Sequence, residues 1–97
     1  MPLTTKQKAH LRALAHHRRV IVTVGTAGVT EPVLGEIDKA LARHELLKIR
    51  LPAGERAKRE DMLSEIGETL EAEVVQSIGR VGVLYRRGEK PRITIPD

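Results

Sequence analysis

Residues 20–34 read VIVTVGTAGVTEPVL, and this stretch decides which fold the rest of the chain can form. Residues 20–24 are rich in β-branched side chains and predict a buried strand. The next four residues, Gly25, Thr26, Ala27 and Gly28, form a Gly-x-x-Gly loop. Thr30 then suits the N-cap of a helix, with Glu31 and Pro32 favoured in its first turn. The stretch therefore predicts a strand, a tight loop and a helix in direct succession.

Two further helices are predicted from capping signals and hydrophobic periodicity. Thr4 and Gln7 match a capping box that opens the first helix. Basic side chains recur along one face of this helix at spacings of three and four: Lys8, Arg12, His16 and Arg19. The helix that begins after Thr30 keeps its period to about His44, and another covers residues 55–70.

The remaining apolar segments predict strands. Alternation in LLKIRL (46–51) indicates a strand with one face in contact with water. Residues 74–78 and 81–85 are two strands joined by Gly79-Arg80, a tight hairpin with glycine in the first turn position. Residues 92–95 are a candidate for a short final strand.

The order of these elements indicates the fold class. It runs helix, strand, helix, strand, helix, strand, strand. Strand–helix–strand units favour parallel pairing with a right-handed crossover, whereas the last two strands form an antiparallel hairpin. We therefore expect an α/β fold with one mixed four-stranded sheet packed by helices. A chain of 97 residues supports one core, so we expect residues 1–97 to form a single domain.

The composition is that of an ordinary soluble protein, and a monomer is the default expectation. No apolar run approaches the roughly 20 residues that cross a bilayer, and the N-terminus lacks the apolar stretch of a signal peptide, so we expect a cytoplasmic protein. The absence of cysteine excludes disulfides and thiolate metal sites. Tyr85 is the only Phe, Trp or Tyr residue, so the chain lacks the row of stacking rings on which many single-strand binders depend.

Charge is distributed unevenly along the chain. Residues 1–30 carry five basic side chains and no acid, and residues 80–92 carry five basic side chains and one acid. Residues 31–79 carry seven basic and eleven acidic side chains. If the two basic ends meet in space, they form a one-sided positive patch typical of nucleic-acid binders. A solvated surface of mixed charge is the alternative that charge alone leaves open.

The groups needed for catalysis or metal binding are missing from the pattern. His10, His16 and His17 lie among basic residues that would repel a cation, so we expect no metal site. Ser64 lies within a helix and Ser77 within a strand, and neither has an evident base to activate it as a nucleophile. We expect no cofactor and no enzymatic activity. A small phosphate-handling activity at the loop is the enzyme alternative.

Two explanations fit the paired glycines of the loop. The first is turn geometry, since any tight connection from strand to helix can use glycine. The second is close approach of an anion, because free N–H groups and the helix dipole favour negative charge at a helix N-terminus. Glu31 opposes the second explanation through its charge, and Pro32 removes one N–H donor.

Four separated blocks of the sequence together resemble one known family. The blocks are TKQKAHLRALAH (5–16), VGTAGVTEPVLGEIDKAL (24–41), HELLKIRL (44–51) and GVLYRR (82–87). They resemble the CRM domain, the RNA-binding module of chloroplast splicing factors, and more closely its small stand-alone bacterial members, the YhbY-like proteins. The resemblance implies the α-β-α-β-α-β-β fold, similar to the C-terminal domain of translation initiation factor three.

The same resemblance implies a function and a set of site residues. It implies binding of structured RNA and, for the bacterial members, association with precursors of the large ribosomal subunit. The expected RNA-binding residues are Lys8, Arg12, Arg18, Arg19, Gly25, Thr26, Ala27, Gly28, Arg80, Arg86 and Arg87. Many family members carry a basic residue inside the loop, whereas Thr26 and Ala27 are uncharged. The alternative is a protein–protein adaptor that docks on ribosomal particles through the acidic third helix.

Overall fold

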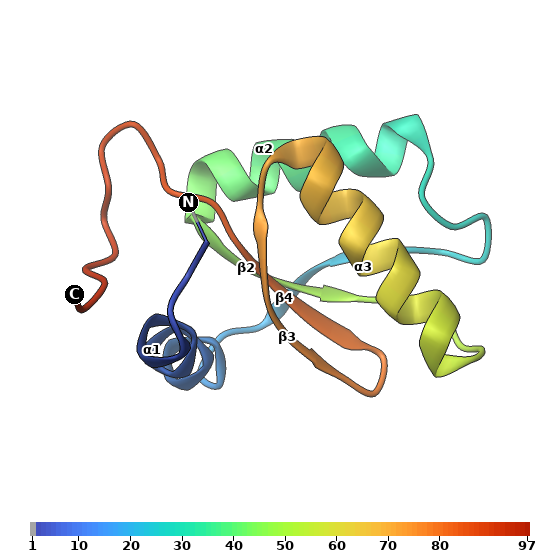
Figure 1. Ribbon diagram of the computed structural model, residues 1–97. Helices are drawn as coiled ribbons and strands as arrows, with labels where there is room; N and C mark the ends of the chain where they lie inside the picture. Colours follow the sequence, from blue (N-terminus) through green and yellow to red (C-terminus); the bar gives the residue numbers. More distant parts are fainter. Residues whose placement is uncertain (1) are drawn as a thin grey trace.

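Three helices and four strands make up the computed structural model, which describes residues 2–97 (Figure 1). In chain order they are α1 (Thr5–Ala15), β1 (Val20–Thr23), α2 (Glu31–His44), β2 (Leu46–Arg50), α3 (Arg56–Leu70), β3 (Glu73–Ile78) and β4 (Val81–Tyr85). This order confirms the predicted α-β-α-β-α-β-β fold.

The strands form one mixed sheet with helices on both faces. Its strand order is β1-β2-β4-β3, with β1 parallel to β2 and the other neighbours antiparallel. Helices α2 and α3 cover one face, and α1 lies on the other (Figure 1). Because side chains alternate along a strand, the sheet separates two cores. Ile49 and Leu84 pack beneath α2 and α3, whereas Leu46 and Val83 pack beneath α1.

The caps predicted from the sequence begin α1 and α2. The Thr4 hydroxyl accepts the Gln7 N–H at 3.1 Å, and the Gln7 side-chain oxygen accepts the Thr4 N–H at 2.9 Å. Thr30 accepts the N–H of Val33 at 3.4 Å. These bonds satisfy N–H groups that a helix leaves free in its first turn. The α2 cap fixes where the Gly-x-x-Gly loop ends.

Three sequence-based expectations differ from the structure. β1 is an edge strand, and α1 packs mainly over β2 and β3, so Ile21 is 50% exposed rather than buried. α1 ends at Ala15, so Arg19 does not lie on its face. Residues 92–95 form no strand, because the N–H groups of Arg92 and Ile93 donate to the Glu45 carboxylate instead.

The two ends of the sheet carry different segments. What we call the loop end comprises the Gly-x-x-Gly loop, residues 51–55, the first turn of α3 and the Gly79-Arg80 turn. The tail end comprises residues 18–19, Glu45 and residues 86–97. Within residues 2–97, every helix is too short or too polar to cross a membrane.

Candidate nucleic-acid interface

The two glycines of the Gly-x-x-Gly loop have different structural roles. Gly28 is buried, has a φ of 79° and donates its N–H to the Gly25 carbonyl at 3.0 Å. Positive φ favours glycine, so turn geometry accounts for Gly28. Gly25 is exposed, lies outside the positive-φ region, and a Cβ built on it would have no atom within 4 Å. Neither backbone geometry nor packing explains Gly25, and it leaves the loop entrance open to a close partner.

Exposed basic side chains occupy the same end of the sheet as the loop. Arg50 closes β2, and Arg80 lies in the turn between β3 and β4. The Nε of Arg80 donates to the Leu51 carbonyl at 3.0 Å, which restrains its guanidinium group and leaves the Nη atoms available. Arg56 and Lys58 extend from the first turn of α3. The loop end therefore combines an open backbone with several cations.

Hydrogen bonds and packing connect these pieces into one surface. The Nε of Arg59 donates to the Gly79 carbonyl at 2.9 Å, and its Nη1 donates to the Gly54 carbonyl. These bonds attach α3 to the hairpin turn and to the preceding loop. A Cβ at Gly28 would lie 3.9 Å from Met62 Cε, so the Gly-x-x-Gly loop passes beside α3. The cations and the loop are consequently held in a fixed relation.

Nearby acids leave most of this charge available. Arg56 forms an exposed ion pair with Glu60 at 3.4 Å. Arg50 and Lys58 have no ion pair within residues 2–97. Glu31 and Glu55 lie at the start of α2 and before α3, and both are exposed. Arg50, on the α1 face of the sheet, and Lys58, on α3, thus each keep a charge that can attract an anion.

A partly open face of the sheet links α1 to the loop end. The Lys48 ammonium donates to the carbonyls of Ala15 and Arg18 at 3.2 and 3.3 Å, which places a cation at the C-terminal end of α1, as the helix dipole favours. Between α1 and the sheet lies a groove of about 270 Å³, whose lining includes Arg12, Lys48 and Ile78. Ile78 is 62% exposed. Arg12 and Lys48 thus continue the basic surface along the sheet from Arg50.

The structure separates other predicted residues from the loop. Arg18 and Arg19 precede β1, whereas the loop follows it, so they lie at the tail end together with Arg87. Lys8 lies beside Glu68 and Glu73 in a shallow depression near β3. The basic first helix is therefore not the immediate neighbour of the loop that the chain order suggested.

Arg86 serves the fold directly. It forms an ion pair with Asp38 at 2.7 Å and also donates to the carbonyls of Asp38 and Leu70, each at 3.0 Å. These contacts hold the strand end of β4 against α2 and α3. Both Nη atoms are engaged within the protein, and Asp38 offsets the charge of Arg86.

A buried carboxylate organises the tail end. Glu45 is 2% exposed and accepts the N–H groups of Gly88, Arg92 and Ile93 at 2.7, 2.8 and 3.1 Å. Burial raises the pKa of Glu45, but these hydrogen bonds outweigh burial, and the pKa lies below its usual value. The basic segment after β4 is therefore held in place rather than left loose.

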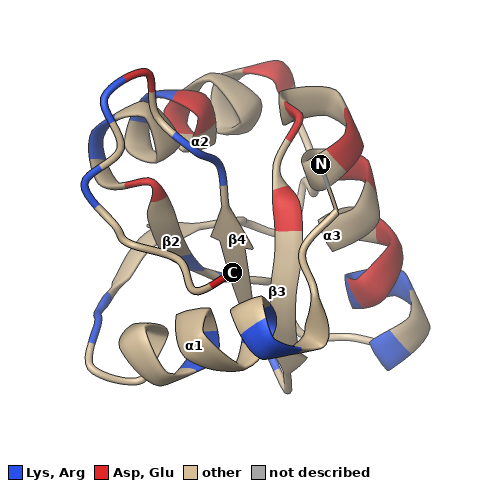
Figure 2. Cartoon of the chain, turned by 60° about the vertical axis from the view of Figure 1, so that its left-hand side comes forward, with Lys and Arg blue, Asp and Glu red and all other residues tan. Residues whose placement is uncertain are grey.

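Several interface residues escaped the sequence analysis: Lys48, Arg50, Arg56, Lys58 and Arg59. A signal for the first two was present, since alternation puts Lys48 and Arg50 on the polar face of β2. The α3 cations were hidden because residues 31–79 sum to a negative charge. Figure 2 shows how charge is separated within α3: basic residues cluster at one end of the helix, and acidic residues follow its outer side.

Comparison with known proteins places the chain in a family. The family model of the CRS1/YhbY (CRM) domain matches residues 3–86. A protein of Haemophilus influenzae named "RNA-binding protein" is 42% identical over 97% of this chain and 95% of its own length. A protein of Pseudomonas aeruginosa named as a probable RNA-binding protein is 38% identical over 94% of this chain and 88% of its own length.

A solved structure agrees with the fold. The solution structure of a hypothetical protein from Staphylococcus aureus, described as a candidate RNA-binding protein, has a TM-score of 0.87 to this chain at 33% identity. The similarity covers 97% of this chain and 99% of that protein. The chain belongs to the CRS1/YhbY (CRM) domain family.

Proposed function

We propose that the protein binds structured RNA through its loop end and acts as a ribosome-assembly factor on precursor large-subunit ribosomal RNA. One observation carries the proposal. The open backbone at Gly25 lies at the same end of the sheet as the cations of β2, the hairpin turn and α3. The RNA-binding names of the relatives support the nucleic-acid part. The ribosomal part rests on the family resemblance, and we further propose that the protein acts in the cytoplasm.

Recognition through phosphates and shape fits the side chains available. Tyr85 is the only Phe, Trp or Tyr residue and is 4% exposed, so it cannot stack on a base. Duplex RNA is recognised mainly through its shape and backbone, for which a basic surface is sufficient. We propose that the Gly25–Ala27 backbone admits one phosphate closely. Arg50, Arg80 and Lys58 hold adjacent phosphates, and Arg12 extends the contact along the sheet.

We also propose that residues 1–97 form one binding domain without catalytic activity. Lys8 and Arg86 contribute little to RNA binding in this proposal, since acids neighbour Lys8 and Asp38 engages Arg86. Arg18, Arg19 and Arg87 lie at the tail end and would contact a different part of the RNA.

The salt dependence of binding to a large-subunit ribosomal RNA domain tests the proposal. For each phosphate that the protein no longer neutralises, the slope of log affinity against log salt should become shallower by roughly 0.7 to 0.9. We expect this decrease in the double variant Arg50→Gln/Lys58→Gln. The control variant Lys6→Gln/Lys39→Gln removes the same charge from exposed positions on α1 and α2 and should leave the slope unchanged. Equal slopes in both variants, or no binding by the native protein, would overturn the proposal.

A further inference from the structure

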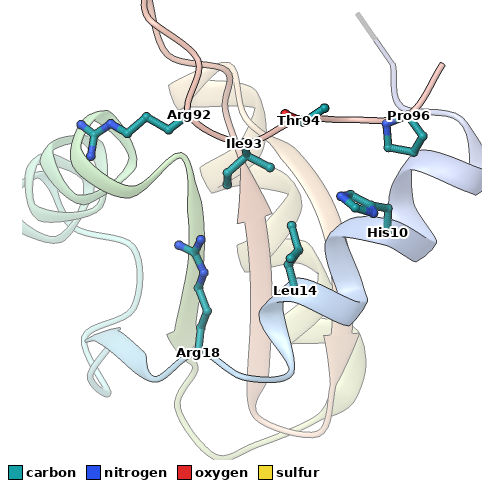
Figure 3. Close-up of a pocket in the computed structure, with 7 residues that line it drawn as sticks. All are labelled: His10, Leu14, Arg18, Arg92, Ile93, Thr94 and Pro96. Carbon is teal, nitrogen blue, oxygen red and sulfur yellow. The ribbon is translucent and has the colours of Figure 1, made fainter.

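A second groove lies at the tail end, away from the Gly-x-x-Gly loop. It has a volume of about 480 Å³ and runs between α1 and the C-terminal segment. Figure 3 shows that Leu14 and Ile93 point toward each other across it. The guanidinium groups of Arg18 and Arg92 lie on one side of this pair, and the His10 ring lies on the other. The groove thus has a cationic end, an apolar middle and a ring at its far end.

The fold holds this arrangement in place through a buried charge. The Glu45 carboxylate accepts the backbone N–H groups of both Arg92 and Ile93, at 2.8 and 3.1 Å. Burying a carboxylate is costly unless it is hydrogen-bonded, and these donors offset that cost. The Arg92 side chain remains exposed while its backbone is fixed. Arg18 is restrained by donation from Nη1 to the Leu46 carbonyl at 3.4 Å.

The shape and chemistry of the groove fit one nucleotide. Its volume lies within the range of about 300–1,000 Å³ typical of small-ligand sites. Among residues 2–97, no acidic side chain lines it. The two arginines on the same side of the groove suit a phosphate. An aliphatic floor ending in an imidazole suits the flat face of a base, since histidine is among the side chains on which unpaired bases stack.

We propose that the groove is a subsite for one unpaired nucleotide of RNA. Its phosphate lies at Arg18 and Arg92, and its base lies against Leu14, Ile93 and His10. This inference rests on the proposed RNA-binding function and adds a second, single-stranded contact to the duplex contact at the loop end. The RNA target would then be a helix that continues into an unpaired strand.

The test uses one ribosomal RNA hairpin in two forms, blunt-ended and with a short single-stranded extension. A stacked base contributes about 1–3 kcal/mol, so the extension should raise the affinity of the native protein by at least about fivefold. Arg92→Ala should abolish this gain and leave the affinity for the blunt hairpin within about twofold. His10→Ala should reduce the gain, as should an abasic extension. Thermal unfolding of each variant confirms that the fold is retained.

Lys90→Ala is the matched control, because it removes the same charge from the same exposed segment outside the groove. It should keep the full gain from the extension. Equal affinity of the native protein for the two hairpins would overturn the nucleotide subsite alone. So would an equal effect of Arg92→Ala and Lys90→Ala on both RNAs. Failure of the native protein to bind either hairpin would instead overturn the proposed function.

Discussion

Gly25 and Gly28 lie three residues apart in one loop, yet their surroundings predict opposite consequences of substitution. Gly28→Ala forces a side chain into a φ of 79° and should lower the free energy of unfolding by about 1–2 kcal/mol. Gly25→Val meets no atom within 4 Å of its Cβ and should change stability by less than about 0.5 kcal/mol. Because its side chain would hold a phosphate away from the backbone, Gly25→Val should weaken RNA binding by about tenfold, or 1.4 kcal/mol.

Chemical denaturation and RNA titration of both variants check this contrast. Gly35→Ala, on the exposed side of α2, serves as a control for adding a methyl group and should not reduce RNA affinity. A large loss of stability in Gly25→Val, or unchanged RNA affinity, would return both glycines to turn geometry.

The carboxylate of Glu45 makes the stability of the fold depend on pH. Its pKa in the folded protein is lowered from the usual 4.5, because the hydrogen bonds from residues 88, 92 and 93 outweigh burial. The folded state therefore binds this proton less readily than the unfolded state, and the stabilisation is fully present above pH 4.5. It is lost as the pH falls through the folded pKa. Glu45→Gln should cost about 2 kcal/mol at neutral pH and progressively less in acid.

Thermal unfolding from neutral pH to below pH 4.5 measures the difference in stability between the native protein and Glu45→Gln. Glu89→Gln removes an exposed acid from the same segment and should follow the native curve. A difference between native and Glu45→Gln that stays constant down to low pH would show that the Glu45 charge does not hold the tail.

Helix α3 has a basic start and an acidic outer side, and the two halves belong to competing functional hypotheses. RNA binding at the loop end depends on Arg56 and Lys58, whereas a protein adaptor would depend on exposed acids such as Glu65 and Glu68. We expect Glu65→Gln/Glu68→Gln to retain association with large-subunit precursor particles. Arg56→Gln/Lys58→Gln should reduce it several-fold, because the variant lacks Lys58, which holds a phosphate, and the neighbouring charge of Arg56.

Sedimentation of each variant with precursor particles distinguishes the two hypotheses. The paired variants change the same number of charges on the same helix, so each controls for the other. Loss of association in the acid-neutralised variant alone would favour the adaptor.

The elements that sequence patterns predicted well are those whose determinants are local. Thr4 and Gln7 cap α1, and Gly79 with a φ of 55° forms the hairpin turn, through contacts within a few residues. Ile21 was predicted to be buried because its β-branched run gives no sign of an edge position. The C-terminal segment was a candidate strand because its true partner, the Glu45 side chain, lies more than forty residues earlier.

The candidate site was predictable only in part, for a related reason. The loop is contiguous in sequence and was found directly. Its cationic neighbours come from β2, the hairpin and α3, and summing charge along the chain mixed Lys58 with the acids of the same helix. Only the fold shows that Lys58 lies beside the loop end while α1 lies across the sheet from α2 and α3.

At the scale of the whole molecule, charge divides the surface into regions of opposite sign. The acidic outer side of α3 would repel phosphates and therefore limits where RNA can lie (Figure 2). The loop end and the tail end are both basic, and they lie at opposite ends of the sheet. We therefore expect a duplex contact at the loop end and a single-stranded contact at the tail end, with the acidic side of α3 facing away from RNA.

Backbone amide shifts of the labelled protein, titrated with a large-subunit ribosomal RNA hairpin, test whether RNA binds at the loop end. We predict that the amides of Gly25, Thr26 and Ala27 shift together with those near Arg50 and Arg80, while amides along the acidic side of α3 stay unchanged. Shifts confined to α3 or absent from the loop end during saturable binding would contradict the claim that the Gly-x-x-Gly end is the RNA surface.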